Sequence, residues 1–184
     1  YVSVRTGVAL EDTRPFRWND CEVSPAYTYV VDLTPGPEEV KARFSSDARR
    51  NIRDGEDSEF TIADEGVAGA RLIVERVHDR FADPSEEFDL PTEFVVDLHE
   101  DLPAGQVRPL VCRVDGEFAG GLLALEYGDT VYRWLGGARP DRDVDLPVND
   151  LIDWYVMRDA MDRGLAAYDL VGAGTPRIND YKLK

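Results

Sequence analysis

The stretch VRPLVCRVDGEFAGGLLALEYGDTVYRWLGGA, residues 107–138, decides the fold class of this chain. It contains three mainly apolar runs separated by Asp115-Gly116 and Gly128-Asp129. Both pairs are typical of tight hairpin turns, because Gly and Asp tolerate positive φ angles. Three runs joined by two such turns predict an antiparallel meander of three strands.

Upstream of the meander the sequence predicts a strand followed by helices. Residues 27–33, YTYVVDL, are rich in β-branched and aromatic residues and indicate a strand. A helix is expected from Pro37, with Thr34 as its candidate N-cap. It breaks near Ser45–Ser46, where Asp47 is a candidate cap for a second helical segment. A short strand at 58–66 and helices at 69–81 and 91–102 follow.

Downstream of the meander lies a long helix and then a final strand. Residues 146–164 carry apolar side chains at helical spacing, and Gly164 is placed to end the helix. The residues expected on one side are Val148, Leu151, Ile152, Tyr155 and Met161. Residues 167–173, AYDLVGA, predict a strand. We therefore expect an α/β (α+β) domain with a central mixed sheet, an antiparallel meander and flanking helices.

The chain is strongly acidic, with 37 Asp and Glu against 21 Lys and Arg and a net charge of −16. Its only lysines are Lys41, Lys182 and Lys184. An acidic surface in which Arg outnumbers Lys favours a halophilic protein, since molar salt screens the self-repulsion. The alternative is an acidic face for a basic partner, but the acids are spread along the whole chain. DNA is not an expected partner, because binding the phosphate backbone needs a broad basic face.

Cysteine usage and hydropathy indicate a cytoplasmic protein. Cys21 and Cys112 are far apart and form no CxxC pair, so no disulfide framework is expected. No apolar run approaches the length of a membrane span, and neither a span nor a signal peptide is expected. Residues 1–26 are rich in Pro, Asp and Arg and are expected to be a linker or the tail of a preceding domain. We expect the chain to be part of a longer polypeptide.

Four stretches, in this order and spacing, carry a family resemblance. They are YTYVVDLTPGPEEVKARFSSDARRNIRDGED (27–57), VDGEFAGGLLALEYGDTVYRWLGGARPD (114–141), PVNDLIDWYVMRDAMDRGLAAYDLVGA (147–173) and INDYKLK (178–184). The chain resembles the GNAT superfamily of acyltransferases, and in particular the C-terminal half of FemAB-like aminoacyl transferases. The resemblance implies one GNAT-like domain at 27–184 and a preceding GNAT-like half. It also implies transfer of an aminoacyl or acyl group to an amine acceptor, with aminoacyl-tRNA as donor.

Arg49, Arg50 and Arg53 are a candidate donor-binding cluster. On a helix, two of them share a face, and guanidinium groups match the geometry of phosphate oxygens. They could hold a nucleotide, a tRNA end or a lipid phosphate. The alternative is pairing with nearby acids, namely Asp47, Asp54, Glu56 and Asp57. The resemblance, in which a basic stretch recurs here, favours binding.

The resemblance implies catalytic roles for Tyr181 and Lys182, which match a Phe- or Tyr-Lys pair near the C-terminus of the family. The lysine there stabilises charge on the donor carbonyl or phosphate, a sound role for an ammonium beside an oxyanion. Asp169 matches an acidic residue of the family and is expected either to bind substrate or to hold a neighbouring loop. The alternative for Lys182 is a mobile terminal side chain.

Tyr132 and Trp134 are candidates to line a substrate groove, because alternate residues of a strand point to one face. Core packing is the alternative. Asn149 lies at the start of the long helix, whose free N–H groups can bind an anion. The Q/R-x-x-G-x-G/A loop with which ordinary GNAT enzymes hold CoA is absent, which counts against acetyl-CoA. The donor is expected to be aminoacyl-tRNA or an acyl-CoA. His78 and His99 have no zinc-ligand spacing, and no metal site is expected.

Two other functions remain open on this sequence. One is a conventional N-acetyltransferase that uses acetyl-CoA. The other is a non-catalytic half-domain that packs against a partner domain. No residue is an evident general base, so orientation and charge stabilisation would have to carry an acyl transfer.

Overall fold

The computed structural model describes residues 4, 6–8, 10–80, 88–137, 140, 144–172, 180 and 182–183. Its strands are β1 (Val30–Asp32), β2 (Thr61–Asp64), β3 (Val107–Val114), β4 (Glu117–Tyr127), β5 (Thr130–Gly136) and β6 (Ala167–Asp169). Its helices are α1 (Arg14–Arg17), α2 (Pro37–Arg43), α3 (Ser46–Glu56), α4 (Gly66–Arg80), α5 (Thr92–Asp101) and α6 (Val148–Asp162). In this described part, the strands form one mixed sheet in the order β1-β6-β5-β4-β3-β2.

The central meander is confirmed. β3, β4 and β5 pair antiparallel in chain order. Asp115 and Gly116 join β3 to β4 at φ angles of 53° and 82°, and Gly128 has a φ of 63° at the next turn. Successive positive φ angles give the turn the twist that the flanking strands need. The turn residues therefore give the antiparallel connections that the sequence indicated.

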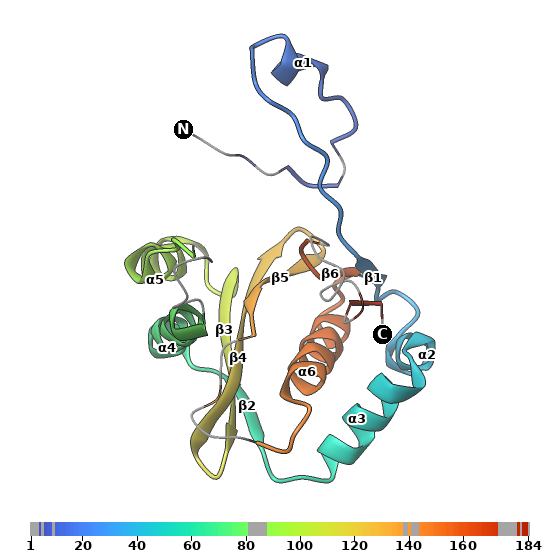
Figure 1. Ribbon diagram of the computed structural model, residues 1–184. Coiled ribbons are helices and arrows are strands. Elements are labelled where there is room, and N and C mark those ends of the chain that lie inside the picture. Colours follow the sequence, from blue (N-terminus) through green and yellow to red (C-terminus); the bar gives the residue numbers. More distant parts are fainter. Residues whose placement is uncertain are drawn as a thin grey trace.

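The two strands from the ends of the domain lie side by side. β6 pairs parallel with β5, and α6 provides the crossover between them. β1 pairs antiparallel with β6 and forms one edge of the sheet. Figure 1 shows β1 and β6 adjacent although they stand at opposite ends of the sequence.

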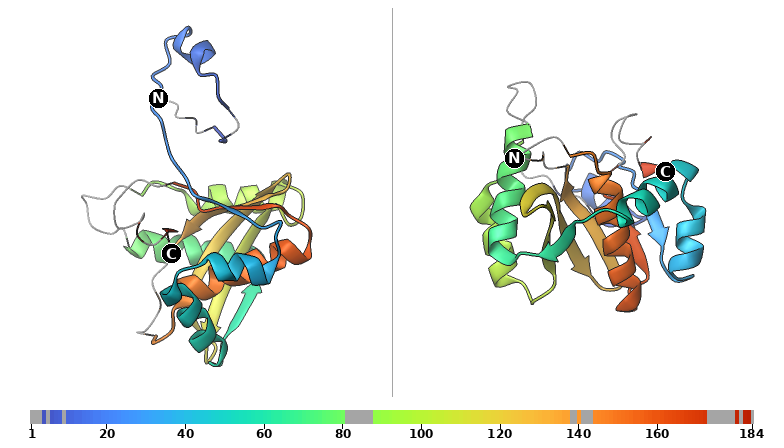
Figure 2. Two further views of the ribbon diagram at one scale, coloured as in Figure 1. Left: turned by 90° about the vertical axis from the view of Figure 1, so that its right-hand side faces the viewer. Right: turned by 90° about the horizontal axis from the view of Figure 1, so that it is seen from below.

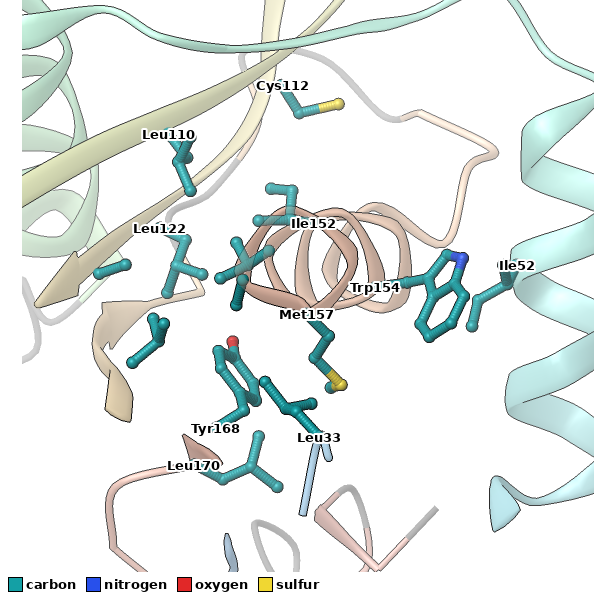
Figure 3. Close-up of a cluster of buried hydrophobic side chains, with 14 of the residues drawn as sticks. Leu33, Ile52, Leu110, Cys112, Leu122, Ile152, Trp154, Met157, Tyr168 and Leu170 are labelled. Atoms are coloured by element: carbon teal, nitrogen blue, oxygen red, sulfur yellow. The ribbon is translucent and has the colours of Figure 1, made fainter. Parts of the chain in front are cut away.

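Helices cover both faces of the sheet (Figure 2). On the first, the α6 face, Leu110, Leu122 and Val131 pack with Ile152 of α6 in the larger buried cluster (Figure 3). On the second, the α4 face, α4 and α5 bury a smaller cluster that includes Ile73. Two buried layers on one sheet give the domain its core.

α6 lies between the sheet and the helices α2 and α3 (Figure 1). Ile152 faces the sheet, whereas Trp154 lies toward Ile52 of α3 and Met157 points toward Leu33 (Figure 3). The prediction of a single apolar side was wrong at Tyr155, which is 38% exposed. A helix packed on both sides buries residues nearly all around, so its sequence loses the one-sided pattern.

The helix starts differ from the predicted caps. Ser45, not Asp47, caps α3, and its hydroxyl accepts a hydrogen bond from the Ala48 N–H at 3.1 Å. Gly36, not Thr34, precedes α2, and Thr34 instead hydrogen-bonds to Asp32. The predicted break between α2 and α3 is confirmed. Where two capping residues stand close together, backbone geometry decides which one is used.

The segment that precedes β1 forms an arm, which Figure 1 shows projecting away from the sheet. The arm contains α1, and none of the residues of α1 is buried. The assignment of residues 1–26 to a linker or a preceding domain stays a prediction. Among the described residues, no helix is both long and apolar enough to span a bilayer.

Candidate functional site

β5 and β6 separate near the middle of the α6 face. Their parallel ladder runs from Thr130 opposite Ala167 to Tyr132 opposite Asp169. β5 continues to Gly136, where it still pairs with β4. The described ladder between β5 and β6 thus ends four residues before the pairing of β5 with β4 does. Such an edge offers N–H and C=O groups to a ligand.

The side chain of Lys182 binds the backbone of residues 170–172, which directly follow β6. Its ammonium donates hydrogen bonds to the carbonyl oxygens of Leu170, Val171 at 2.6 Å and Gly172 at 2.5 Å. All three ammonium hydrogens thus have an acceptor, and stabilising an oxyanion would require one of them to be released. Burial is the main cause that lowers the pKa of Lys182, with Arg133 adding to it. Its predicted catalytic role stays a prediction.

A buried carboxylate joins three elements beside Lys182. Asp153 of α6 accepts hydrogen bonds from Arg133 Nε of β5 at 2.7 Å and from the Tyr168 hydroxyl of β6 at 2.6 Å. Arg133 also donates to Asn149 Oδ1 at 3.3 Å. Because charged hydrogen bonds are stronger than neutral ones, these contacts hold α6 against the place where the strands separate.

Asp169 organises the turn after β6. Its carboxylate accepts hydrogen bonds from Thr28 Oγ1 at 2.5 Å and from the Val171 N–H at 2.8 Å. Val171 has a φ of 45°, in the left-handed region that a β-branched residue rarely adopts. The contact therefore supports the backbone whose carbonyls Lys182 binds.

A cavity of about 370 Å³ lies between α6, α2, α3 and β1, and we call it the α3–α6 chamber. Its apolar wall includes Val31, Val40, Phe44, Ile52, Trp154 and Met157. Figure 3 shows Trp154, Ile52 and Met157 at this place. Leu170 and Lys182 also line it, so the chamber reaches the backbone that leaves β6.

A second cavity of about 350 Å³ lies at the N-terminus of α6. Asn51 of α3, Gly120 of β4 and Asn149 line it. Asp150 lines both cavities and accepts a hydrogen bond from Asn51 Nδ2 at 2.6 Å. The start of a long helix presents free N–H groups, a suitable environment for a ligand's negative charge.

The three arginines lie on α3, and each contacts a protein acceptor. Arg49 donates to the backbone carbonyls of Ala42, at 3.0 Å, and Phe44, at the end of α2. Arg50 pairs with Asp47 at 3.3 Å, and Arg53 with Asp54 at 3.0 Å. The pairs of Arg50 and Arg53 are exposed, so a ligand could replace them at small cost. Donor binding by the cluster stays a prediction.

The remaining predicted residues do not gather at one place. Trp134 packs against the buried cluster of the α4 face, opposite the chamber. A register irregularity in β5 accompanies this packing, since Leu123 faces Leu135 while Ala124 faces Arg133. Tyr132 is half-buried in the strand, and Tyr181 lies outside the described residues.

Sequence reasoning missed the residues at the centre of this arrangement. Arg133 and Asp153 each interrupt an apolar stretch, VYRWLG in β5 and LIDWYV in α6. A charge inside an apolar run is a usable signal, because a buried charge requires a partner. In the described part of the chain, no group of three His, Cys, Asp or Glu residues could hold a metal ion.

Comparison with known proteins identifies the family. Residues 42–183 match the acetyltransferase (GNAT) domain. The crystal structure of FemX is similar at a TM-score of 0.68 and 13% identity, over 84% of this chain and 55% of that one. The C-terminal domain of a putative lysylphosphatidylglycerol synthetase from Agrobacterium fabrum is similar at a TM-score of 0.51 and 15% identity, over 86% and 49%. No curated protein sequence matches.

This chain spans about half the length of those solved structures. The similarity confirms the FemAB-like GNAT fold expected from the sequence, whereas a halophilic origin stays a prediction. Because the match to the GNAT domain covers most of the chain, this protein belongs to the GNAT acetyltransferase domain family.

Proposed function

We propose that this domain transfers an acyl or aminoacyl group to an amine, with the reacting carbonyl beside the free edge of β5. The separation of β5 from β6 after Tyr132 and Asp169 is the observation that carries the proposal. β5 continues with β4 as far as Gly136, so the N–H groups beyond Tyr132 that point to the β6 side would lie beside such a carbonyl. Such donors, fixed in advance, stabilise the negative charge that develops on a carbonyl oxygen during acyl transfer.

The chemistry requires few side chains. The amine nitrogen attacks the carbonyl carbon, and the resulting tetrahedral oxyanion is stabilised by backbone N–H groups. The bond to the donor's sulfur or ribose oxygen then breaks, and the amine proton passes to water or to the leaving group. Orientation supplies much of the rate in such a reaction. Lys182 would hold the carbonyls of residues 170–172 so that β6 cannot extend its pairing along β5.

The phosphate-bearing end of the donor is proposed to lie at the start of α6 and along α3. The second cavity lies there, between Asn51 and Asn149. Arg50 and Arg53 are exposed on α3, with exposed fractions of 59% and 69%. The resemblance to FemAB-like transferases favours aminoacyl-tRNA as donor. A preceding GNAT-like half is the proposed partner in the full-length protein, since this chain covers 55% of the FemX structure.

Titration of the full-length protein with aminoacyl-tRNA and, separately, acetyl-CoA tests the proposal, and KCl is varied from physiological to molar concentration. The variant is Arg50→Ala with Arg53→Ala, which leaves the Arg49 contacts to α2 intact. A matched control with the same change of charge is Arg17→Ala with Arg158→Ala, both exposed and on other helices than α3. We expect one donor to bind and the α3 variant to weaken it at least fivefold.

The outcomes separate the candidates. Binding of aminoacyl-tRNA that weakens in the α3 variant supports aminoacyl transfer. Binding of acetyl-CoA alone supports acyl transfer of the conventional kind. If neither donor binds at any salt concentration, the proposal is wrong and a non-catalytic half-domain is the better description.

A further inference from the structure

We infer that the α3–α6 chamber holds the apolar chain of the transferred group, and that the preferred donor carries a medium-length acyl chain rather than acetyl. The inference rests on the acyl form of the proposed function, in which the donor carries an acyl chain rather than an aminoacyl group. To that function it adds the class of acyl donor. The evidence is the lining, the position and the volume of the chamber.

Every charged side chain that lines the chamber already has a partner inside the protein. Asp32 accepts from Thr34, and Arg43 donates to Glu39. The two acids of α6, Asp150 and Asp153, accept from Asn51 and from Arg133 with Tyr168, while Lys182 donates to three carbonyls. The surface left for an occupant is therefore mainly hydrocarbon, and an apolar cavity of this kind binds apolar ligands.

One aromatic side chain that lines the chamber, Trp154, has a polar group without a hydrogen bond. Trp154 Nε1 is buried and has no hydrogen-bond partner among the described residues. The indole lies between α6 and Ile52 of α3, packs edge-on to Phe44 at 5.7 Å, and has Lys41 over its ring at 5.3 Å. Orphan indole donors are rare in protein cores. Its N–H is thus a sensitive reporter of anything that enters the chamber.

The chamber begins where the proposed reaction takes place. Leu170, which lines it, directly follows Asp169, the last residue of β6 that pairs with β5. Asp153 lines the chamber and also binds Arg133, the first β5 residue beyond that pairing. An acyl carbonyl at the free edge of β5 would therefore direct its chain toward α2 and α3.

The volume of the chamber, about 370 Å³, leaves room for a chain of medium length. An octanoyl chain has eight carbons and fits, whereas an acetyl group would leave most of the chamber unfilled. Each CH₂ removed from water strengthens binding by up to about fourfold.

Two neutral thioesters test the inference in wild-type protein: S-acetyl-N-acetylcysteamine and S-octanoyl-N-acetylcysteamine. We expect the octanoyl compound to bind at least about 50-fold more tightly. In ¹H–¹⁵N spectra, assigned with Trp→Phe variants, the indole signal of Trp154 should shift on binding. The signal of Trp18, exposed in the arm that precedes the sheet, should not shift.

A matched pair of variants locates the chain. Ala48 lines the chamber, and Ala48→Leu reduces its volume. Ala42→Leu places the same side chain at an exposed helical position. We expect Ala48→Leu to weaken octanoyl binding at least tenfold and acetyl binding less than twofold, while Ala42→Leu changes neither. If Ala48→Leu does not fold, as judged by circular dichroism, the wild-type comparison and the Trp154 signal decide.

Equal affinity for the two thioesters, or octanoyl binding that leaves the Trp154 signal in place, would overturn the inference. So would octanoyl binding that Ala48→Leu and Ala42→Leu affect alike. None of these readouts needs a donor with phosphates or a completed transfer. If binding depends on chain length but no acyl transfer occurs, only the proposed function is overturned. If transfer occurs without dependence on chain length, only the inference about the chamber is overturned.

Discussion

Arg133 of β5 and Asp153 of α6 form an ion pair of 2.7 Å whose side chains are only 12% and 8% exposed. The pair lies beside the point where β5 separates from β6, and Tyr168 of β6 donates to the same carboxylate. One carboxylate thus connects both separating strands to the crossover helix between them. Removing either charge would leave the other without its partner in a poorly hydrated place, which is costly.

Asp153→Ala is expected to lower the free energy of unfolding by about 3 to 5 kcal/mol. The physical reason is the loss of the acceptor for Arg133 Nε and for the Tyr168 hydroxyl. Urea denaturation measures the effect, and Asp162→Ala, an exposed acid on the same helix, is the control with an expected change within about 0.5 kcal/mol. Similar effects of the two variants would show that the pair contributes little.

Cys112 should resist thiol reagents and make stability depend on pH. Burial raises the pKa of its thiol to about 11 from an ordinary value of 9.0. At pH 8 we expect Cys21, which is exposed, to react with a thiol reagent at least about 100-fold faster than Cys112. Peptide mapping after timed labelling distinguishes the two sites.

The sign of the pH effect follows from the raised pKa of Cys112. Its contribution to stability is fully present below pH 9 and is lost as pH rises to about 11, because the unfolded chain releases the thiol proton first. Unfolding free energies at pH 8 to 11 for wild type and Cys112→Ala check this. The wild-type curve should fall more steeply, and parallel curves would refute the linkage.

Arg49 should matter for stability more than its two neighbours do. It donates to Ala42 and Phe44 carbonyls at the end of α2, whereas Arg50 and Arg53 form exposed pairs. Arg49→Ala is expected to cost about 1 kcal/mol of unfolding free energy and each of the other two less than about 0.5 kcal/mol. Thermal or urea unfolding of the three single variants tests the order, which would be wrong if all three were equal.

Gly121 should not tolerate a side chain. A Cβ at this position of β4 would lie 2.5 Å from Ile73 Cγ1 of α4 and 3.4 Å from the carbonyl oxygen of Leu110. Gly121→Ala is expected to cost about 1 to 3 kcal/mol, because the buried helix must move away from the sheet. Gly7→Ala, where a Cβ would meet nothing within 4 Å, is the control for urea denaturation. Equal stability of both variants would show that α4 readjusts freely.

The sequence predicts those parts of the fold that local chemistry determines. The turns at Asp115-Gly116 and Gly128-Asp129 specify the meander, and Gly164, at a φ of 79°, ends α6. The choice of Ser45 over Asp47 as cap was not predictable, because both residue types cap helices. The burial of Trp154 was missed because α6 packs on two sides, which removes the one-sided pattern.

The candidate site is harder to predict than the fold, because its parts come from distant segments. Trp134 was a reasonable groove candidate by strand alternation, yet it packs on the α4 face, since alternation does not say which face holds the ligand. Asp153 and Arg133 signalled a buried pair only through charge in apolar runs, and nothing in the sequence says that they meet. Donor binding by Arg50 and Arg53 is what the titration of the α3 variant tests.

The pairing of β1 with β6 has a consequence for synthesis on the ribosome. Val30 lies opposite Asp169, so the strand first made must wait for about 140 residues before its neighbour exists. The α3–α6 chamber is also completed late. Its walls include α2, α3 and β1, but also Leu170 and Lys182, which are made last. A nascent chain arrested before residue 167 can form the meander but leaves β1 without its neighbouring strand, and chaperones that recognise apolar surface should engage it there.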